Sequence, residues 1–342
     1  MYIKNAKLNN FTVFQEVSFN FSTGINIFIG ENGSGKTHIM KVLYSACKAT
    51  ESKTSFSNKL VKTMLPDDFK ISRLVTRKRG NNTADISVEA SSDDEKSKKK
   101  LQISFNNKTK KWDAEVKGEE AWEKSFNDTS SIFIPAKEIL SHSYKLAAAV
   151  DKNNVVFDDT YIDIINSSQI DISVGRNSAS KDAMLKRIEQ ITDGKVVYDE
   201  RRDEFYLKKG NSKQEFNLVA EGIRKMAMLW QLVKNGTLEK GSVLFWDEPE
   251  TNINPSYISV IAELLLELSR HSVQIFISTH DYMLAKYFEV RKKNYDKLLF
   301  HSLNKENGVV EYEQGERFDQ LKHNSIISSF NALLDEIYDC EV

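Results

Sequence analysis

The segment from Gly30 to Thr37 constrains the fold of this chain more than any other. It contains the residues Gly-Glu-Asn-Gly-Ser-Gly-Lys-Thr, follows the apolar run Ile25–Ile29 and opens a helical pattern over residues 36–49. A strand, a glycine-rich turn and a helix in this order form a loop whose backbone N–H groups point at a phosphate, and the helix dipole adds favourable charge. The segment therefore predicts a nucleotide-phosphate site in an α/β fold.

The side chains of this loop have separate predicted roles. Lys36 supplies a cation to the terminal phosphates, and the Thr37 hydroxyl is a ligand for Mg²⁺. The predicted ligands are therefore ATP and Mg²⁺. The predicted nucleotide-binding residues are Gly30, Glu31, Asn32, Gly33, Ser34, Gly35, Lys36, Thr37 and His38.

Two carboxylates follow a second apolar strand. The run Val243–Trp246 delivers Asp247 and Glu248 at its C-terminal end, where open α/β sheets bind their ligands. We expect Asp247 to hold the Mg²⁺ shell and Glu248 to act as general base on the attacking water. A solvated acidic turn is the simpler alternative, but the phosphate loop elsewhere in the chain favours the catalytic interpretation.

A histidine ends a third strand pattern. The run Ile275–Ser278 is followed by Thr279 and His280, so the imidazole is expected at the same edge of the sheet. There it can reach the γ-phosphate or the attacking water, a role that suits a histidine. The alternative is a surface histidine that caps the next helix. Beside the other two motifs we favour the catalytic role for His280.

The remaining patterns divide the chain into three parts. Residues 1–134 contain alternating strand patterns and we expect an N-terminal ATPase lobe with an antiparallel β subdomain. Residues 135–216 form a helical, variable insertion, and residues 217–342 form a C-terminal lobe in which strands alternate with helices, as in a parallel sheet covered by helices. The expected strands of the β subdomain include residues 71–77, 84–90, 101–105 and 112–116, and expected helices are residues 135–150, 179–191, 221–233 and 318–338.

Composition limits the possible partners. The 342 residues carry a formal net charge of −1, so no global basic field attracts nucleic acid or an anionic membrane. Two cysteines and no long apolar run predict a cytoplasmic protein without a membrane span. DNA contact would have to come from local basic patches, and solvated loops are the simpler interpretation of each. The candidate patches are residues 73–79, 108–111 with Trp112 beside them, and 291–293.

The three motifs, in this order, resemble the ABC-type ATPase superclass, and their form is similar to the SMC/RecF/OLD branch of AAA-family ATPases. The resemblance implies an ABC/SMC-head-like P-loop fold, here without the coiled-coil arm because no sustained heptads are present. It also implies a homodimer, or a higher homo-oligomer, in which a signature segment of one protomer completes the ATP site of another. The candidate signature residues are Ala220, Glu221, Gly222 and Arg224.

Two positions depart from the pattern of that family. Ala220 stands where the signature serine is expected, and its hydroxyl contact is missing or replaced by Arg224 or Lys225. The segment Pro135–Glu138 stands where a Mg²⁺-coordinating glutamine is expected. We therefore expect ATP hydrolysis that is slow or triggered by a partner.

The biological role rests on the resemblance alone. A compact head without arms or a nuclease module resembles the stand-alone ATPase subunits of anti-phage systems such as PARIS, Septu or AbiL. The leading hypothesis is an ATPase that dimerises around ATP and gates a separate effector protein in bacterial anti-phage defence. The alternative is a RecF-like DNA-repair ATPase that clamps DNA. A transporter motor is a third possibility, which the incomplete signature disfavours.

Overall fold

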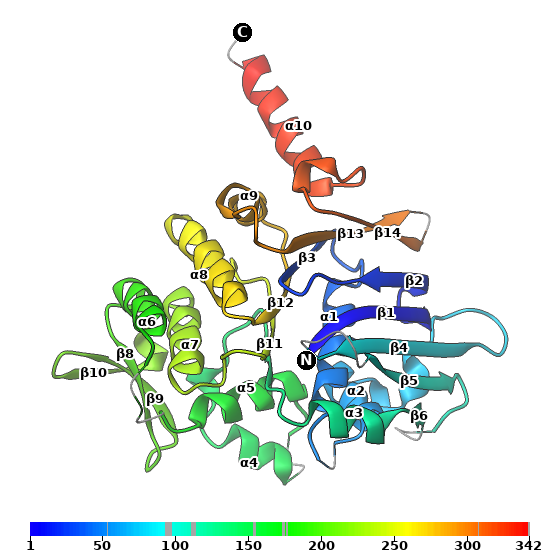
Figure 1. Cartoon of the computed structure of the whole chain (residues 1–342), viewed down its shortest axis with the longest axis horizontal. Coiled ribbons are helices and arrows are strands. Elements are labelled where there is room, and N and C mark those ends of the chain that lie inside the picture. Colours follow the sequence, from blue (N-terminus) through cyan, green and yellow to red (C-terminus); the bar gives the residue numbers. More distant parts are fainter. Residues whose placement is uncertain are drawn as a thin grey trace.

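Three sheets organise the computed structural model, which describes residues 1–52, 54–92, 98–110, 114–152, 155–172, 175, 177–306 and 308–340. The largest is a six-stranded sheet in the order β14-β13-β3-β12-β11-β7, parallel except for β14. Strands from both ends of the sequence therefore share one sheet (Figure 1). Its strands are β3 (Ile25–Gly30), β7 (Ser131–Ile134), β11 (Val243–Asp247), β12 (Gln274–Ser278), β13 (Leu298–Glu306) and β14 (Val309–Gly315).

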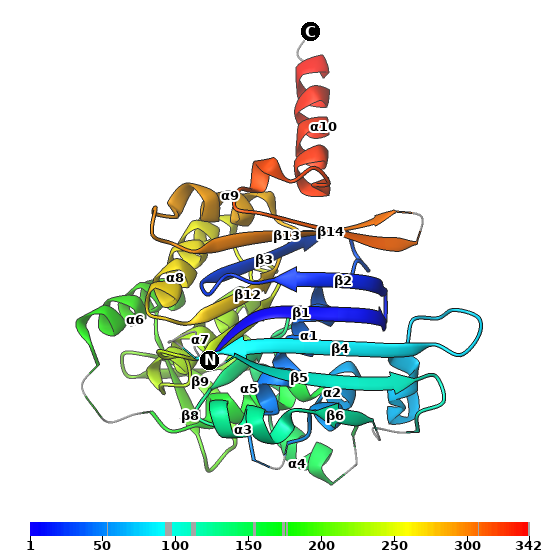
Figure 2. The same cartoon turned by 45° about the vertical axis from the view of Figure 1, so that its right-hand side comes forward.

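An antiparallel five-stranded sheet forms the β subdomain, as the sequence predicts. Its order is β2-β1-β4-β5-β6, and its long strands run side by side in Figure 2. The predicted strand over residues 71–77 is wrong: Ile71–Leu74 is a short 3-10 turn, because both of its terminal side chains are buried at a three-residue spacing. The strands are β1 (Tyr2–Phe11), β2 (Phe14–Asn20), β4 (Thr83–Ser91), β5 (Lys98–Asn106) and β6 (Glu115–Lys117).

Helices cover both faces of the parallel sheet. The helices α1, α2 and α3 lie toward the antiparallel sheet, whereas α5 to α9 cover the opposite side (Figure 1). A third sheet, β8-β9-β10, is antiparallel and lies within residues 135–216. These elements are α1 (Lys36–Lys48), α2 (Phe56–Met64), α3 (Glu119–Phe126), α5 (Asp159–Gln169), α6 (Ala179–Thr192), α7 (Glu221–Lys234), α8 (Ile258–Arg270), α9 (Tyr282–Arg291), β8 (Lys195–Asp199), β9 (Glu204–Lys209) and β10 (Ser212–Glu215).

The predicted helix over residues 135–150 is largely wrong. Only the short α4 (Leu146–Asp151) is α-helical, and Lys145 before it has a left-handed backbone with φ of 52°. That conformation interrupts a right-handed helix at this position. The segment from Pro135 to Ile139 is instead held in an irregular path by the buried Glu138, whose carboxylate accepts hydrogen bonds from the backbone N–H and the hydroxyl of Ser141.

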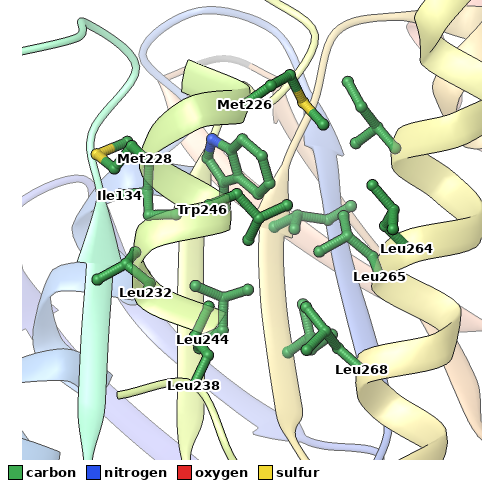
Figure 3. Packing of buried hydrophobic residues seen from close by; sticks show 14 of the residues in the cluster. Ile134, Met226, Met228, Leu232, Leu238, Leu244, Trp246, Leu264, Leu265 and Leu268 are labelled. Carbon is green, nitrogen blue, oxygen red and sulfur yellow. The ribbon is translucent and has the colours of Figure 1, made fainter. Parts of the chain in front are cut away.

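Alternation along the central strands creates two separate hydrophobic cores. On β11, Phe245 faces α1 and the antiparallel sheet, whereas its neighbour Trp246 faces α7 and α8. Figure 3 shows Trp246 directed toward Met226 of α7, with Leu265 of α8 nearby. The parallel sheet is thus buried on both sides, and polar side chains are left to cluster at its edges.

The last helix, α10 (Ser325–Cys340), projects from the body of the protein (Figures 1 and 2). Its base contacts the C-terminal lobe through Phe330, whose ring stacks on Tyr282 with centroids 4.1 Å apart. Toward its end, Leu333 and Tyr338 are exposed. The helix predicted over residues 318–338 is therefore confirmed only from Ser325 onward, because residues 318–320 form a separate 3-10 turn. Within the described ranges, no helix is long and apolar enough to cross a membrane.

Candidate nucleotide site

Three neighbouring parallel strands bring the predicted motifs to one edge of the sheet. Ser278 at the end of β12 pairs with Asp247 at the end of β11 and, on its other side, with Phe28 of β3. The phosphate loop, the two carboxylates and the Thr279–His280 segment therefore leave the sheet side by side. Their association depends on the strand order β3-β12-β11, which places the last motif in the sequence between the first two.

Contacts within the chain fix the conformation of the phosphate loop. Gly35 directly precedes α1 with φ of 101°, and a β-carbon there would come within 2.5 Å of the ring of Phe14, so the turn requires glycine. The Nζ of Lys36 donates to the carbonyl oxygens of Gly30 at 2.7 Å and Glu31 at 3.0 Å. Burial lowers the pKa of Lys36 to about 8, although nearby carboxylates including Asp247 oppose this shift.

The loop also presents groups that a phosphate would complete. Glu31, Asn32 and Gly33 are exposed at the tip, and the hydroxyl of Ser34 is buried without a hydrogen-bond partner among the described residues. A buried polar group without a partner is rare in native structures and requires an explanation. A phosphate group in this cradle supplies one. His38 instead turns its Nδ1 to the Thr12 hydroxyl, 3.1 Å away in the β1–β2 turn, and burial lowers its pKa to about 4.

Oxygen atoms suited to Mg²⁺ converge beside Lys36. The Thr37 hydroxyl donates to Oδ2 of Asp247 at 3.0 Å, and the Ser278 hydroxyl donates to Oδ1 of the same carboxylate. Burial raises the pKa of Asp247, and these two hydrogen bonds oppose that shift. Mg²⁺ is held by one or two protein ligands plus substrate phosphates and water, so Thr37 and Asp247 fit this ion. Within the described ranges, no cluster of three or more His, Cys, Asp or Glu side chains is suited to hold a metal.

Glu248 directly follows Asp247 and has a strained backbone conformation. Its φ is 47°, in the left-handed region that a glutamate seldom adopts. One carboxylate oxygen lies 3.3 Å from Nε2 of His280, and the other accepts from the hydroxyl of Thr251 at 3.2 Å. Burial lowers the pKa of His280, and the charge of Lys36 lowers it further. The structure therefore brings Glu248 and a neutral His280 together at the site.

Glu250 is a member of this cluster that sequence reasoning missed. Its Oε1 accepts from the Thr279 hydroxyl at 2.6 Å and from the backbone N–H of His280 at 3.1 Å, so it fixes the segment that carries the histidine. Burial raises the pKa of Glu250, and no described residue donates to its Oε2. The available signal was its place two residues after Glu248. Ser278 was signalled in the same way, by its place at the strand end before His280.

The predicted signature segment lies at the start of α7, and several of its residues contact other parts of the same chain. A β-carbon on Gly222 would lie 2.3 Å from the carbonyl oxygen of Asn252, so glycine is required there by a contact within the chain. Arg224 forms an ion pair of 2.7 Å with the fully buried carboxylate of Glu138, and Lys225 donates to the carbonyl of Thr251. Neither cation is therefore available to replace the missing signature hydroxyl in this conformation. Ala220 is exposed and Glu221 is half-buried.

The basic patches are dispersed. Residues 77–79 are exposed, whereas Arg291 is ion-paired with Glu263 at 2.7 Å and Lys292 donates to the carbonyl of Glu316. Lys111 and Trp112 lie outside the described residues. In the predicted patch over residues 73–79, Arg73 is ion-paired with Asp67 at 3.1 Å, which leaves the exposed residues 77–79 as its basic part.

The parallel sheet, the phosphate loop and the carboxylates beside it define a P-loop ATPase fold. A family model described as "AAA domain, putative AbiEii toxin, Type IV TA system" matches residues 25–285, and the chain belongs to this family.

Comparison with solved structures supports the fold. An SMC head bound to the C-terminal winged-helix domain of ScpA superposes with a TM-score of 0.60 at 12% identity, over 92% of this chain and 98% of that one. A Pyrococcus furiosus complex of an SMC head with an extended coiled coil and the ScpA C-terminal domain gives a TM-score of 0.55 at 12% identity, over 98% of this chain and 99% of that one. These likenesses establish an SMC-head architecture, which is the predicted fold class.

Sequence comparison adds a local match to a repair ATPase. The RecF protein of Clostridium novyi, a DNA replication and repair protein, is 34% identical over 88 residues, 26% of this chain and 24% of that protein. RecF of Francisella tularensis subsp. mediasiatica is 33% identical over 100 residues, 26% of this chain and 28% of that protein. The chain thus spans about a quarter of the curated relatives it matches.

Proposed function

We propose that this protein binds ATP with Mg²⁺ at Gly30–Thr37 and hydrolyses it, with Glu248 as general base. The observation that carries the proposal is the convergence of Lys36, Asp247, Glu248 and His280 at one edge of the parallel sheet. These four side chains come from three separate places in the chain: the phosphate loop, the end of β11 and the loop after β12. A purely structural cluster does not require a cation, two adjacent carboxylates and a histidine beside a phosphate loop.

Each side chain has a defined task in this proposal. Lys36 would exchange its two carbonyl partners for phosphate oxygens, and the Thr37 and Asp247 oxygens would hold Mg²⁺, which would neutralise phosphate charge. Glu248 accepts the proton of the attacking water. His280, kept neutral at physiological pH by its lowered pKa, lies 3.3 Å from the Glu248 carboxylate and orients that water or the γ-phosphate.

We infer further that two protomers close over two nucleotides, each offering its α7 start to the other. Support comes from Leu218, which is 71% exposed immediately before α7, beside the exposed Ala220. Burial of this side chain against a second protomer would remove its apolar surface from water, which favours association. In this proposal residues 1–134 and 217–342 form the two ATPase lobes and residues 135–216 form the insertion between them.

The concentration dependence of activity tests this proposal. A site completed in trans predicts phosphate release per protomer that rises with protein concentration and then saturates, as the dimer forms. A specific activity that stays constant over a 100-fold range of concentration, with a monomeric mass throughout, would show a site complete in one chain. Absence of ATP binding would refute the proposal as a whole.

We propose that the ATP-closed dimer controls a separate effector protein in anti-phage defence. The local RecF similarity favours a second candidate, an ATPase that clamps DNA, with residues 77–79 as the first contact. Co-purification with the product of the neighbouring gene, with and without ATP, tests the first role. Binding to duplex DNA at several salt concentrations tests the second, because phosphate contacts make affinity fall steeply with salt.

A further inference from the structure

A fully buried lysine lies behind the proposed catalytic centre. Lys225 is on the first turns of α7, has no exposed surface, and donates from Nζ to the carbonyl oxygen of Thr251 at 2.9 Å. Burial lowers its pKa, and the nearby acidic side chains of Glu221, Glu250 and Glu248 oppose that shift. An ammonium group is costly to bury, and an apolar side chain of similar length would fill the same space at less cost. Its presence therefore calls for an explanation beyond packing.

Thr251 connects this lysine to the general base. Its hydroxyl donates to Oε2 of Glu248 at 3.2 Å, and its backbone N–H donates to the Glu248 carbonyl at 3.1 Å. The turn from Glu248 to Thr251 thus holds the carboxylate on one side, opposite His280. Because the backbone of Glu248 is strained, with φ of 47°, the carboxylate stays in place only while its surroundings fix it.

The start of α7 touches the same turn at a second point. The carbonyl of Asn252 packs directly against the Cα of Gly222, leaving no room for a β-carbon. Lys225 lies three residues further along the helix, on the same side. The helix start and the turn after β11 are therefore joined by two contacts, so that a displacement of one displaces the other.

We propose that Lys225 is a positioning residue for ATP hydrolysis, which transmits the position of the α7 start to Glu248 through Thr251. This inference rests on the proposed function. It assigns to the signature helix a role within its own protomer: when the helix start is engaged by a partner protomer, the Lys225–Thr251 link sets the carboxylate for proton transfer.

Isosteric substitutions test this link. Thr251→Val removes the hydroxyl but keeps the carbonyl, Thr251→Ser keeps both, and Lys225→Met removes the ammonium group. We expect Thr251→Val and Lys225→Met each to lower the single-turnover hydrolysis rate at saturating ATP about 10-fold, the scale of outer-shell substitutions. The dissociation constant for a fluorescent ATP analogue should stay within about twofold, because neither group touches the phosphate loop. Lys240→Met, at an exposed lysine, is the matched control.

The double variant Lys225→Met/Thr251→Val distinguishes a link from two separate effects. If both residues act through one path, its rate equals that of the slower single variant. The inference would be overturned if the rate losses of the two single variants multiply in the double variant, or if the rates are unchanged. It would also be overturned if Thr251→Ser loses as much rate as Thr251→Val. If Lys225→Met does not fold, the Thr251 pair alone decides. A wild-type protein that does not hydrolyse ATP refutes the proposed function, whereas a hydrolysing wild type with unaffected variants refutes only this link.

Discussion

Two polar clusters meet the helix α1, and they differ in how completely their groups are satisfied. The first, at its N-terminus, is the proposed nucleotide site. The second lies along its side, where Lys41 pairs with Asp158 and the Tyr44 hydroxyl donates to Asp163 at 2.5 Å. Lys59 of α2 adds ion pairs of 2.8 Å to Asp159 and 2.6 Å to Asp163. In this second cluster each ammonium group has a carboxylate partner, so the cluster fastens α5 of the insertion to α1 and α2.

In the proposed nucleotide site, by contrast, several polar groups lack a charged or hydrogen-bonding partner. The Ser34 hydroxyl and Oε2 of Glu250 have no partner among the described residues, Lys36 donates only to neutral carbonyls, and Glu248 is strained. Buried polar groups that satisfy one another stabilise a fold, whereas groups left unsatisfied and strained are typical of places where a ligand completes the structure. The two clusters that contact α1 thus differ: the polar groups of one satisfy each other, whereas the proposed nucleotide site keeps groups that a ligand could bind.

Removing a cation from the structural cluster should give the largest effect. Lys59→Met leaves Asp159 and Asp163 half-buried without their cation, and we expect the free energy of unfolding to fall by roughly 3–5 kcal/mol. ATP affinity of the folded fraction should not change. Urea unfolding measures the first and titration with ATP the second. Lys62→Met, at an exposed lysine on the same helix, is the control, and an equal loss in both variants would contradict the distinction.

Glu248→Gln should reverse this pattern. The amide oxygen still accepts from Thr251, but the base is lost, so we expect the hydrolysis rate to fall roughly 10²- to 10³-fold while stability and ATP affinity hold. Steady-state phosphate release and equilibrium ATP binding provide the two measurements. Glu239→Gln, at an exposed glutamate, is the control. A variant with near wild-type turnover would remove Glu248 from the role of general base.

Lys36→Met probes the phosphate loop itself. Charge-assisted hydrogen bonds are lost in the ATP complex, and we expect ATP affinity to fall about 100-fold, equivalent to ~2.7 kcal/mol. Because the ammonium group is buried beside neutral carbonyls in the absence of ligand, stability without ATP should be equal or higher. Calorimetric titration and thermal unfolding check both parts. A marked loss of stability without ATP would mean that Lys36 belongs to the structural class.

Acidification should weaken the fold modestly through His301. This histidine is fully buried between Asn26 and Tyr312, and burial lowers its pKa to about 3. The unfolded chain takes up a proton near pH 6.5, whereas the folded chain does not, so stability is complete above pH 6.5 and is lost as the pH falls below it. The loss from this residue should be about 2 kcal/mol at pH 5. Urea unfolding at several pH values measures it, and His301→Gln should lose that part of the slope.

The sequence predicted the parts of the site that are local in the chain. Gly30–Thr37, Asp247 with Glu248, and His280 each follow a short apolar strand, so their type and their edge of the sheet could be inferred together. The Lys225–Thr251 and Arg224–Glu138 contacts could not be inferred, because they depend on how the start of α7 lies over a turn and a loop from elsewhere in the chain. A buried lysine on a helix also looks the same in sequence as an exposed one.

The fold shows the same limit. Strands of the parallel sheet were predicted from apolar runs with turn residues at their ends. The helix predicted over residues 135–150 was wrong because its periodicity contains no signal for the left-handed Lys145 or for the buried carboxylate of Glu138. The helix α2 was missed because Phe56–Met64 contains a lysine, Lys59, that is buried through ion pairs and therefore looks like a surface position in sequence.

The mass of Glu248→Gln by light scattering, with ATP and with ADP, distinguishes a site that two protomers share from a site that is complete in one chain. A site completed by a second protomer predicts a dimer with ATP that does not decay, a monomer with ADP, and a return to monomer when Lys36→Met is added. A mass that is the same with both nucleotides, in a protein that still binds ATP, would contradict the claim that ATP closes two protomers around this site.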